Sequence, residues 1–219
     1  VIHVERDRTL TLLDCGAGKI THSGSAGGQG VLADGTFYMY GGTITQNWGD
    51  DSRNDYAGGV YVSGGTFIMN DGTITGNSTK TKSPNTTSRG YGGGVYGKDA
   101  TITINGGTIT GNKATNGGAI YAKGGTLTIG KANITGNTAT HGGGGICAYN
   151  CALTIDGTTV TGNNGGESLG GGIYISGAKG KGTASDPYIP AVIQNATIQN
   201  NTAKCGGGIN DSGPVKISD

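Results

Sequence analysis

A short unit that opens with glycines and closes with asparagine recurs along the chain, and it constrains the fold more than any other feature. Its plainest copy covers residues 117–137, with a glycine pair, three short runs of alternating apolar and polar residues, and a closing Asn. Successive copies close 30, 35, 25, 26 and 38 residues apart, at Asn47, Asn77, Asn112, Asn137, Asn163 and Asn201. A shortest spacing of about 25 residues, with longer spacings that contain insertions, is typical of a solenoid in which each copy forms one coil.

The residues within each copy favour β-strands over helices. Thr, Ile and Val dominate the alternating runs, and β-branched residues in alternation are typical of half-buried strands. Glycine supplies 48 of the 219 residues and recurs at the ends of these runs, which disfavours helices and permits tight corners. We therefore predict an all-β chain, a single-stranded parallel β-helix of about seven coils of three short strands. Residues 1–219 form one domain, with residues 1–27 as an atypical first coil, because terminal repeats end the stack.

The alternation also predicts which side chains fill the interior. Each strand should point one set of side chains inward, and coils in register should stack equivalent residues about 4.8 Å apart. The inward sets are Val60, Val95, Ile120, Ile146, Ile173 and Ile209 in the first strand; Phe37, Met39, Phe67, Met69, Ile102, Ile104, Leu127, Ile129, Leu153 and Ile155 in the second; and Ile44, Ile74, Ile109, Ile134, Val160 and Ile198 in the third. The closing asparagines should stack too, each amide bonding the next, because buried polar groups need partners.

Composition argues against several classes of partner and site. The formal net charge is +1, so no general attraction to nucleic acid or to an anionic membrane is expected. The sequence contains no apolar run long enough for a membrane span. The four cysteines lack zinc spacing, and we expect no metal and no cofactor. Cys147 and Cys151 are close enough in sequence for a local disulfide. No signal peptide is visible at Val1, so we expect a monomeric segment of a longer surface protein.

Two motifs resemble those of a known family. GGAI at residues 117–120, and ITGNTAT followed by GGGGI within residues 134–146, resemble the GGA[ILV] and FxxN repeats of chlamydial polymorphic outer-membrane proteins. The unit is also similar to repeat regions of wall proteins of Gram-positive gut bacteria. The resemblance implies a right-handed parallel β-helix of the pectin-lyase-like superfold, secreted or on a bacterial cell surface. Ile stands where the chlamydial motif has Phe, so that subfamily's secretion route is not carried over. The fold serves lyases, hydrolases, adhesins and stalks alike, so it implies no particular activity.

A column of tyrosines is predicted on the outer face of the first strand. The outward position holds Tyr61, Tyr96, Tyr121, Cys147 and Tyr174 in successive coils. Exposed tyrosines would offer sugar rings or a partner protein both apolar area and a hydroxyl. The alternative is that tyrosine is simply a good strand residue, which stacks on its neighbours and shields the sheet.

Insertions predict a second region for binding. Residues 48–57, 78–91 and 164–170 all come after the third strand, so they should cluster along one edge of the solenoid. A fourth insertion, residues 178–190, falls after the first strand and therefore at a different corner. The predicted ligand contacts are Trp48, Arg53, Tyr56, Arg89 and Tyr91 of the insertions, together with Tyr61, Tyr96, Tyr121 and Tyr174 of the column.

We predict a non-catalytic adhesin or stalk segment that presents a binding surface for host or microbial glycans or surface proteins. The alternative is a carbohydrate-active enzyme, a polysaccharide lyase or glycoside hydrolase, which would use paired carboxylates or calcium-binding aspartates. Its plausible catalytic set is Asp50, Asp51, Asp55, His141 and Glu167. These residues lack the companion motifs of polygalacturonase-type and pectate-lyase-type sites. The outward T-x-T arrays are broken by Asn133 and Gln199, and we interpret them as solvated strand residues rather than an ice-binding face.

Overall fold

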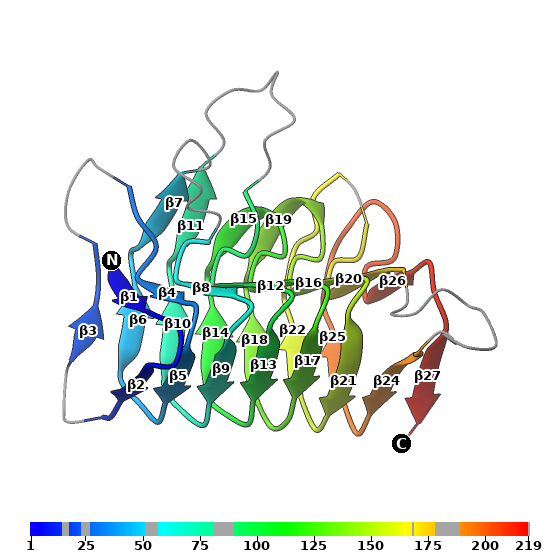
Figure 1. The fold of residues 1–219 in the computed structure, drawn as a ribbon. Coiled ribbons are helices and arrows are strands. Elements are labelled where there is room, and N and C mark those ends of the chain that lie inside the picture. The colour runs from blue at the N-terminus through cyan, green and yellow to red at the C-terminus, as the bar shows by residue number, and fades with distance from the viewer. Residues whose placement is uncertain are drawn as a thin grey trace.

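The protein is a parallel β-helix whose coils stack side by side from the N-terminus to the C-terminus (Figure 1). The structure is a computed structural model that describes residues 1–14, 18–22, 27–50, 57–80, 90–167, 169–177 and 189–218. Its regular elements are all strands, which confirms the predicted all-β class. Within the described residues, no helix of the length and apolarity needed to cross a membrane is found.

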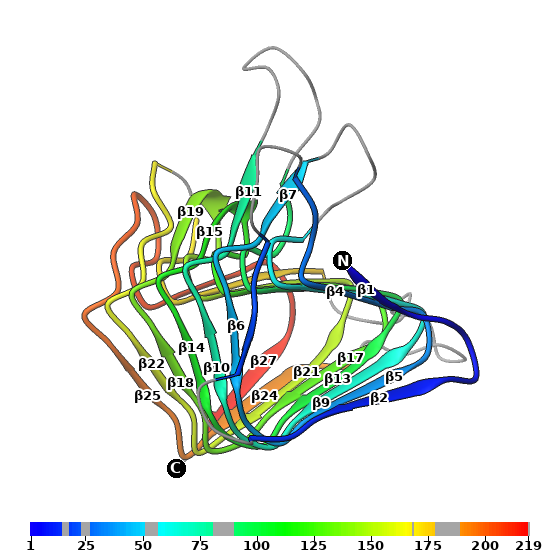
Figure 2. The same cartoon turned by 90° about the vertical axis from the view of Figure 1, so that its left-hand side faces the viewer.

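Three long sheets form the sides of the solenoid, and a fourth, short sheet rises from one corner (Figure 2). Sheet A contains β1 (Ile2–Val4), β4 (Val31–Ala33), β8 (Val60–Ser63), β12 (Val95–Lys98), β16 (Ile120–Lys123), β20 (Ile146–Tyr149), β23 (Ile173–Ser176) and β26 (Ile209–Asp211). Sheet B contains β2 (Thr9–Leu12), β5 (Thr36–Met39), β9 (Thr66–Met69), β13 (Thr101–Ile104), β17 (Thr126–Ile129), β21 (Ala152–Asp156), β24 (Ala191–Gln194) and β27 (Val215–Ser218). Sheet C contains β3 (Lys19–Ile20), β6 (Thr43–Thr45), β10 (Thr73–Thr75), β14 (Thr108–Thr110), β18 (Asn133–Thr135), β22 (Thr159–Thr161) and β25 (Thr197–Gln199). Sheet D contains β7 (Trp48–Asp50), β11 (Ser78–Lys80), β15 (Lys113–Asn116) and β19 (Thr138–Gly142).

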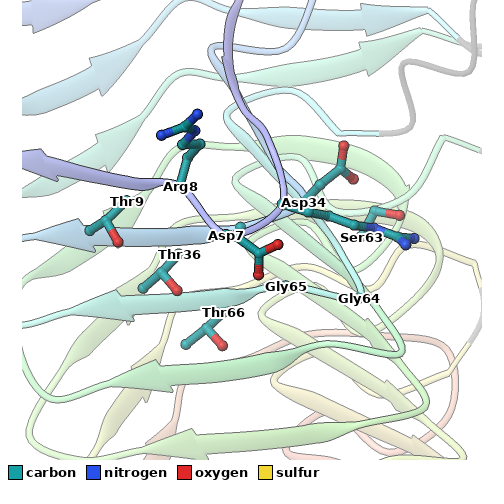
Figure 3. A pocket seen from close by; sticks show the side chains of 11 residues that line it. Asp7, Arg8, Thr9, Asp34, Thr36, Ser63, Gly64, Gly65 and Thr66 are labelled. Atoms are coloured by element: carbon teal, nitrogen blue, oxygen red, sulfur yellow. The ribbon is translucent and has the colours of Figure 1, made fainter.

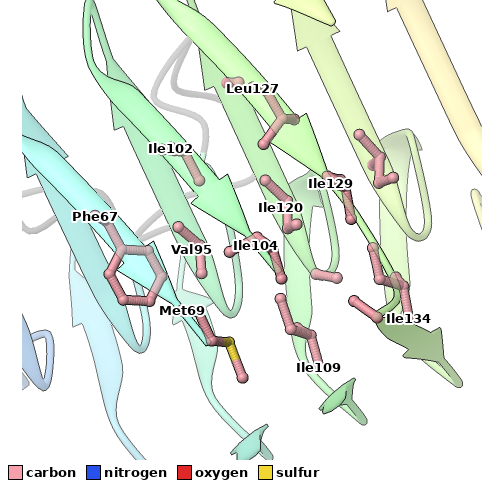
Figure 4. Packing of buried hydrophobic residues seen from close by; sticks show 14 of the residues in the cluster. Phe67, Met69, Val95, Ile102, Ile104, Ile109, Ile120, Leu127, Ile129 and Ile134 are labelled. Atoms are coloured by element: carbon pink, nitrogen blue, oxygen red, sulfur yellow. The ribbon is translucent and has the colours of Figure 1, made fainter. Parts of the chain in front are cut away.

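The register places equivalent residues of successive coils opposite each other. Ile74 pairs with Ile44 on one side and with Ile109 on the other. Such columns fill the interior with close-packed apolar side chains, among them Phe67, Met69 and Ile102 (Figure 4). The predicted inward columns are confirmed, and Ile198 and Ile209 at the C-terminal end pack against the core while only partly buried.

The closing asparagines form a buried ladder, as predicted. The backbone N–H and the side-chain Nδ2 of each Asn both donate to Oδ1 of the Asn in the next coil, at 2.9–3.0 Å. Nδ2 of Asn112 also donates to the carbonyl of Ile74, at 2.9 Å. Each amide therefore satisfies backbone groups at the corner where sheet C ends, which would otherwise be costly to bury.

The glycine that opens each copy is required by close packing between coils. A Cβ atom on Gly118 would collide with the backbone carbonyl of Gly144, its equivalent in the next coil. The same collision would occur between Gly93 and Gly118. The stacked corner therefore leaves no room for a side chain, which explains why this position of the repeat is glycine.

Sheet D was not predicted from the sequence. Its strands come directly after the closing asparagine, so several coils have four strands rather than three. β7 and β11 lie where insertions were predicted, whereas β15 and β19 lie in coils for which none was predicted. In the figures this sheet stands above the three-sided body of the solenoid (Figures 1 and 2). The insertions are therefore partly regular at their bases.

The predicted disulfide between Cys147 and Cys151 is wrong, since neither residue takes part in a disulfide. Cys151 packs in the main core, whereas Cys147 lies in a separate apolar cluster outside it. Their proximity in sequence therefore does not bring the two sulfur atoms together.

Candidate functional site

The edge that carries sheet D is the candidate site, because the two longest insertions on it begin side by side. β7 and β11 pair in parallel, with Trp48 opposite Ser78 and Asp50 opposite Lys80. Figure 2 shows β7 and β11 side by side, and in the sequence the remaining residues of each insertion follow its strand. The prediction that they share one edge is confirmed for their described bases. Of the predicted site residues, Asp51, Arg53, Asp55, Tyr56 and Arg89 lie outside the described residues, as does the side chain of Asp50.

The third insertion joins the same edge three coils beyond the second. Asn164 bridges to Thr138 of β19, and Leu169 bridges to Gly142. Both contacts are parallel bridges that continue the pairing of sheet D. The edge is therefore a continuous structural element rather than a set of unrelated loops.

The tyrosine column is buried, which corrects the expectation that it stands exposed. Tyr61, Tyr96 and Tyr121 retain only 7%, 4% and 7% of their accessible surface. The rings of Tyr61 and Tyr96 stack with centroids 5.0 Å apart and an interplanar angle of 6°. These three tyrosines and Cys147 form a second apolar cluster outside the main core, which we call the tyrosine cluster; Ala57, Leu32, Tyr91 and Tyr174 complete it.

The cluster is buried because the segments that return from sheet D to sheet A pack over it. The ring of Tyr91 lies 4.6 Å from that of Tyr121 and 5.5 Å from that of Tyr96, measured between centroids. At the end of β19, a Cβ atom on Gly142 would lie 3.0 Å from Cδ1 of Tyr174. The side chains do point away from the main core, as predicted, but the base of the insertions covers them.

Burial also changes the acidity of this cluster. Desolvation, with a smaller contribution from nearby Cys147, raises the pKa of the Tyr121 phenol well above its ordinary value. Desolvation likewise raises the pKa of the Cys147 thiol. Both groups therefore stay protonated at a pH above their ordinary pKa values, and a buried, protonated thiol is a poor nucleophile.

Trp48 contacts Gly27 and Gly28 near the N-terminal end of the solenoid, in addition to its pairing with β11. Its carbonyl accepts a hydrogen bond from the backbone N–H of Gly28 at 2.8 Å. A Cβ atom on Gly27 would overlap the indole ring, so the ring lies directly over that glycine. Trp48 is half-buried as a result, and a ligand at this edge would meet only part of the ring.

The two described members of the alternative catalytic set are exposed. His141 lies in β19, where Nδ1 is 3.0 Å from Oγ1 of Thr140. Glu167 lies in the third insertion, next to Gly166. Neither residue lines any of the three surface hollows described for this structure. No group of three or more His, Cys, Asp or Glu side chains suited to a metal ion occurs among the described residues.

Sequence reasoning missed one further pair of aromatic residues. Tyr38 and Tyr40 alternate with the inward Phe37 and Met39, so they lie on the outer face of sheet B. Tyr40 retains 50% of its accessible surface. The alternation in the run Thr-Phe-Tyr-Met-Tyr indicates two outward tyrosines, but only its inward residues were used in the prediction.

Comparison with known proteins identifies the repeat. Residues 105–123 and 131–149 match the family model of the Chlamydia polymorphic membrane protein repeat. The first match spans β14, β15 and β16, and the second spans β18, β19 and β20. Each matched unit therefore runs from sheet C through the ladder asparagine, sheet D and the glycine corner into sheet A. The predicted resemblance is confirmed for these two segments. No curated protein and no solved structure matches the chain.

Proposed function

We propose that the chain is a non-catalytic segment of a bacterial cell-surface or secreted protein that presents a binding surface for a glycan or a protein. The observation that carries the proposal is the pairing of β7 with β11, from which the two longest insertions of this edge begin side by side. The matched repeat is named after a membrane protein, which supports display at the cell surface.

The scaffold beneath this edge is suited to holding loops in place. The asparagine ladder and the tyrosine cluster both adjoin sheet D and help to hold it in place. Binding residues in proteins are often placed on loops that a rigid scaffold positions. Trp48, Tyr91 and the insertion residues Arg53, Tyr56 and Arg89 stay the predicted contacts. The burial of Tyr61, Tyr96 and Tyr121, with the partly buried Tyr174 packed against them, favours a supporting role for the column.

The enzyme alternative gains no support from the described residues. Glycoside hydrolysis requires two carboxyl groups that face each other across the substrate, roughly 5–10 Å apart. His141 and Glu167 are exposed and do not flank a hollow with a second described carboxylate. We therefore do not advance catalysis as a second function.

The test compares insertions at two corners. The intact chain is screened on glycan arrays and against arrayed surface proteins, and two shortened variants are then compared on each hit. One variant replaces residues 51–56 and 81–89 with short Gly-Ser turns. The control replaces residues 178–188, which lie between β23 and β24 at a different corner. Thermal unfolding verifies that both variants fold.

We expect the first variant to lose binding and the control to keep it. Binding that survives removal of both edge insertions would contradict the proposed site. An intact chain that binds nothing on either array would indicate a passive stalk and would overturn the proposal.

A further inference from the structure

A second surface, away from the loop-bearing edge, has the chemistry of a carbohydrate site. We propose that the outer face of β2, β5 and β9 in sheet B binds a neutral oligosaccharide, with Tyr38 and Tyr40 as its stacking platform. This site uses none of the insertions and does not depend on the function proposed for the edge. In Figure 2 these strands lie on the opposite side of the solenoid from sheet D.

The two tyrosines form an exposed aromatic platform. Their ring centroids are 6.2 Å apart and their planes differ by 23°. Tyr40 is half-exposed and Tyr38 is partly exposed. The two rings stack on each other. An exposed tyrosine ring held in this way can pack on the apolar face of a pyranose and lose little conformational entropy in doing so.

Apolar neighbours extend the platform across the sheet. Tyr38 pairs with Ile68 of β9 on one side and with Thr11 of β2 on the other. Leu13 comes directly after Leu12, which pairs with Met39, and it retains 58% of its accessible surface. Leu13 and the half-exposed Tyr40 together form an exposed apolar patch. A ligand can cover such a patch.

A polar hollow adjoins the platform at the start of the strands. Its volume is about 470 Å³, and Figure 3 shows Thr9, Thr36 and Thr66 in one file along it. Thr36 precedes Tyr38 by two residues on the same face of β5. The file therefore supplies hydroxyl groups directly beside the platform, and hydroxyls can both donate to and accept from sugar hydroxyls.

The charges around this hollow are of both signs. Arg6, Asp7, Arg8 and Asp34 all line it, and Oδ2 of Asp34 is 2.7 Å from Nε2 of His3. Arginine offers several donors and aspartate offers acceptors, which is the mixture that a polyhydroxylated ligand requires. Because two arginines and two aspartates line it together, the hollow does not select for a charged ligand.

A second hollow adjoins the other end of the platform. Its volume is about 330 Å³, and its lining includes Gly41, which directly follows Tyr40, together with Asp14 and Asp71. Strand β5 itself, from Thr36 to Met39, covers roughly 10 Å between the two hollows. The two hollows and the platform between them therefore form a track that is longer than a single sugar.

Charge and backbone pairing select the ligand class. The second hollow carries aspartates and has no Lys or Arg in its described lining, so a polyanionic glycan would be repelled there. A peptide that binds by adding a strand needs an unpaired strand edge. β5, which carries Tyr38, has no such edge, since it pairs with β2 and β9 on its two sides, and the nearest free edge of sheet B lies on the far side of β2. A neutral oligosaccharide is not repelled by the aspartates and does not need an unpaired strand edge.

The test uses the intact chain with neutral gluco-, manno- and galacto-oligosaccharides as probes, and with polygalacturonate as a polyanionic comparison. Binding is measured by calorimetry and by saturation-transfer NMR. The variants are Tyr40→Ala and the ring-conserving Tyr40→Phe. Tyr149→Ala is the matched control, because Tyr149 has a similar exposure of 39% but lies in β20 of sheet A.

We expect at least one neutral oligosaccharide to bind, and Tyr40→Ala to weaken it about tenfold. Tyr40→Phe and Tyr149→Ala should retain binding, and so should the variant with shortened edge insertions. That last result separates this site from the loop-bearing edge. The inference is overturned if no neutral oligosaccharide binds, if only polygalacturonate binds, or if Tyr149→Ala weakens binding as much as Tyr40→Ala.

Discussion

Two sets of tyrosines on this solenoid have the same local pattern and opposite surroundings. Tyr96 in sheet A and Tyr38 in sheet B both come directly after an inward core residue and point away from the main core. Tyr96 retains 4% of its accessible surface, whereas Tyr40, two residues after Tyr38, retains 50%. Facing outward from a coil is therefore different from facing solvent.

The difference arises from the segment that connects the ladder asparagine to the next glycine corner. In sheet A this segment returns from sheet D over the strand, so the tyrosines become a second core that supports the edge. In sheet B, Tyr38 is partly exposed and Tyr40 is half-exposed, so these two tyrosines remain available to a ligand. The same residue type thus stabilises the scaffold on one face and offers a contact surface on another.

The largest predicted effect tests this contrast in stability. Tyr96→Ala should lower the free energy of unfolding by about 3 kcal/mol, because it leaves a cavity among packed rings. Tyr40→Ala should change it by less than about 0.5 kcal/mol, since an exposed side chain has few contacts to lose. Urea unfolding followed by circular dichroism compares the two. Equal losses would show that the two tyrosine sets do not differ in burial.

A second prediction uses the acidity of the buried cluster. The pKa values of Cys147 and Tyr121 are raised above their ordinary values of 9.0 and 10.0. Above pH 9 the unfolded chain loses protons that the folded chain keeps, so stability should be level below that pH and fall above it. One group contributes at most about 1.4 kcal/mol per pH unit.

The measurement is urea unfolding at a series of pH values from neutral to alkaline. Cys147→Ala and Tyr121→Phe should each reduce the loss of stability at high pH, because each removes a buried acid. A wild-type chain that is equally stable at neutral pH and well above pH 9 would contradict the burial of these two groups.

The smallest predicted effect concerns the cover of the cluster. A methyl group added at Gly142 would lie 3.0 Å from the Tyr174 ring, whereas one added at Gly130 would have no neighbour closer than 3.4 Å. Relative to Gly130→Ala, Gly142→Ala should destabilise by roughly 1 kcal/mol through overpacking. Differential scanning calorimetry compares the two variants. Identical melting temperatures would place β19 further from the tyrosines than described.

The parts of the fold that depend on local alternation could be predicted from the sequence. Inward columns such as Ile44, Ile74 and Ile109 result from the period of two, and the ladder results from one Asn at a fixed place in each coil. Glycine at the corner reflects the same repetition. These features recur in each coil, so each copy supports the others.

The site could be predicted only in part, because β7 and β11, the strands of sheet D from which its insertions begin, have no such pattern. They read Trp-Gly-Asp and Ser-Thr-Lys, which show neither alternation nor a repeated motif. The burial of the tyrosines depends on how these strands return over sheet A, which is a tertiary effect. Cys147 and Cys151 are close in sequence yet pack in separate apolar clusters. Tyr38 and Tyr40, in contrast, were visible in the alternation and needed only the outward positions to be considered.

The central claim is that the tyrosines of sheet A are covered while those at the start of sheet B are open, and hydroxyl-radical footprinting tests it directly. The native chain is exposed to radicals for a short time, and oxidation at each tyrosine is measured by mass spectrometry, with the urea-unfolded chain as reference. We predict rapid oxidation of Tyr40 and strong protection of Tyr61, Tyr96 and Tyr121 that disappears on unfolding. Oxidation of Tyr96 in the native chain as fast as that of Tyr40 would contradict the account.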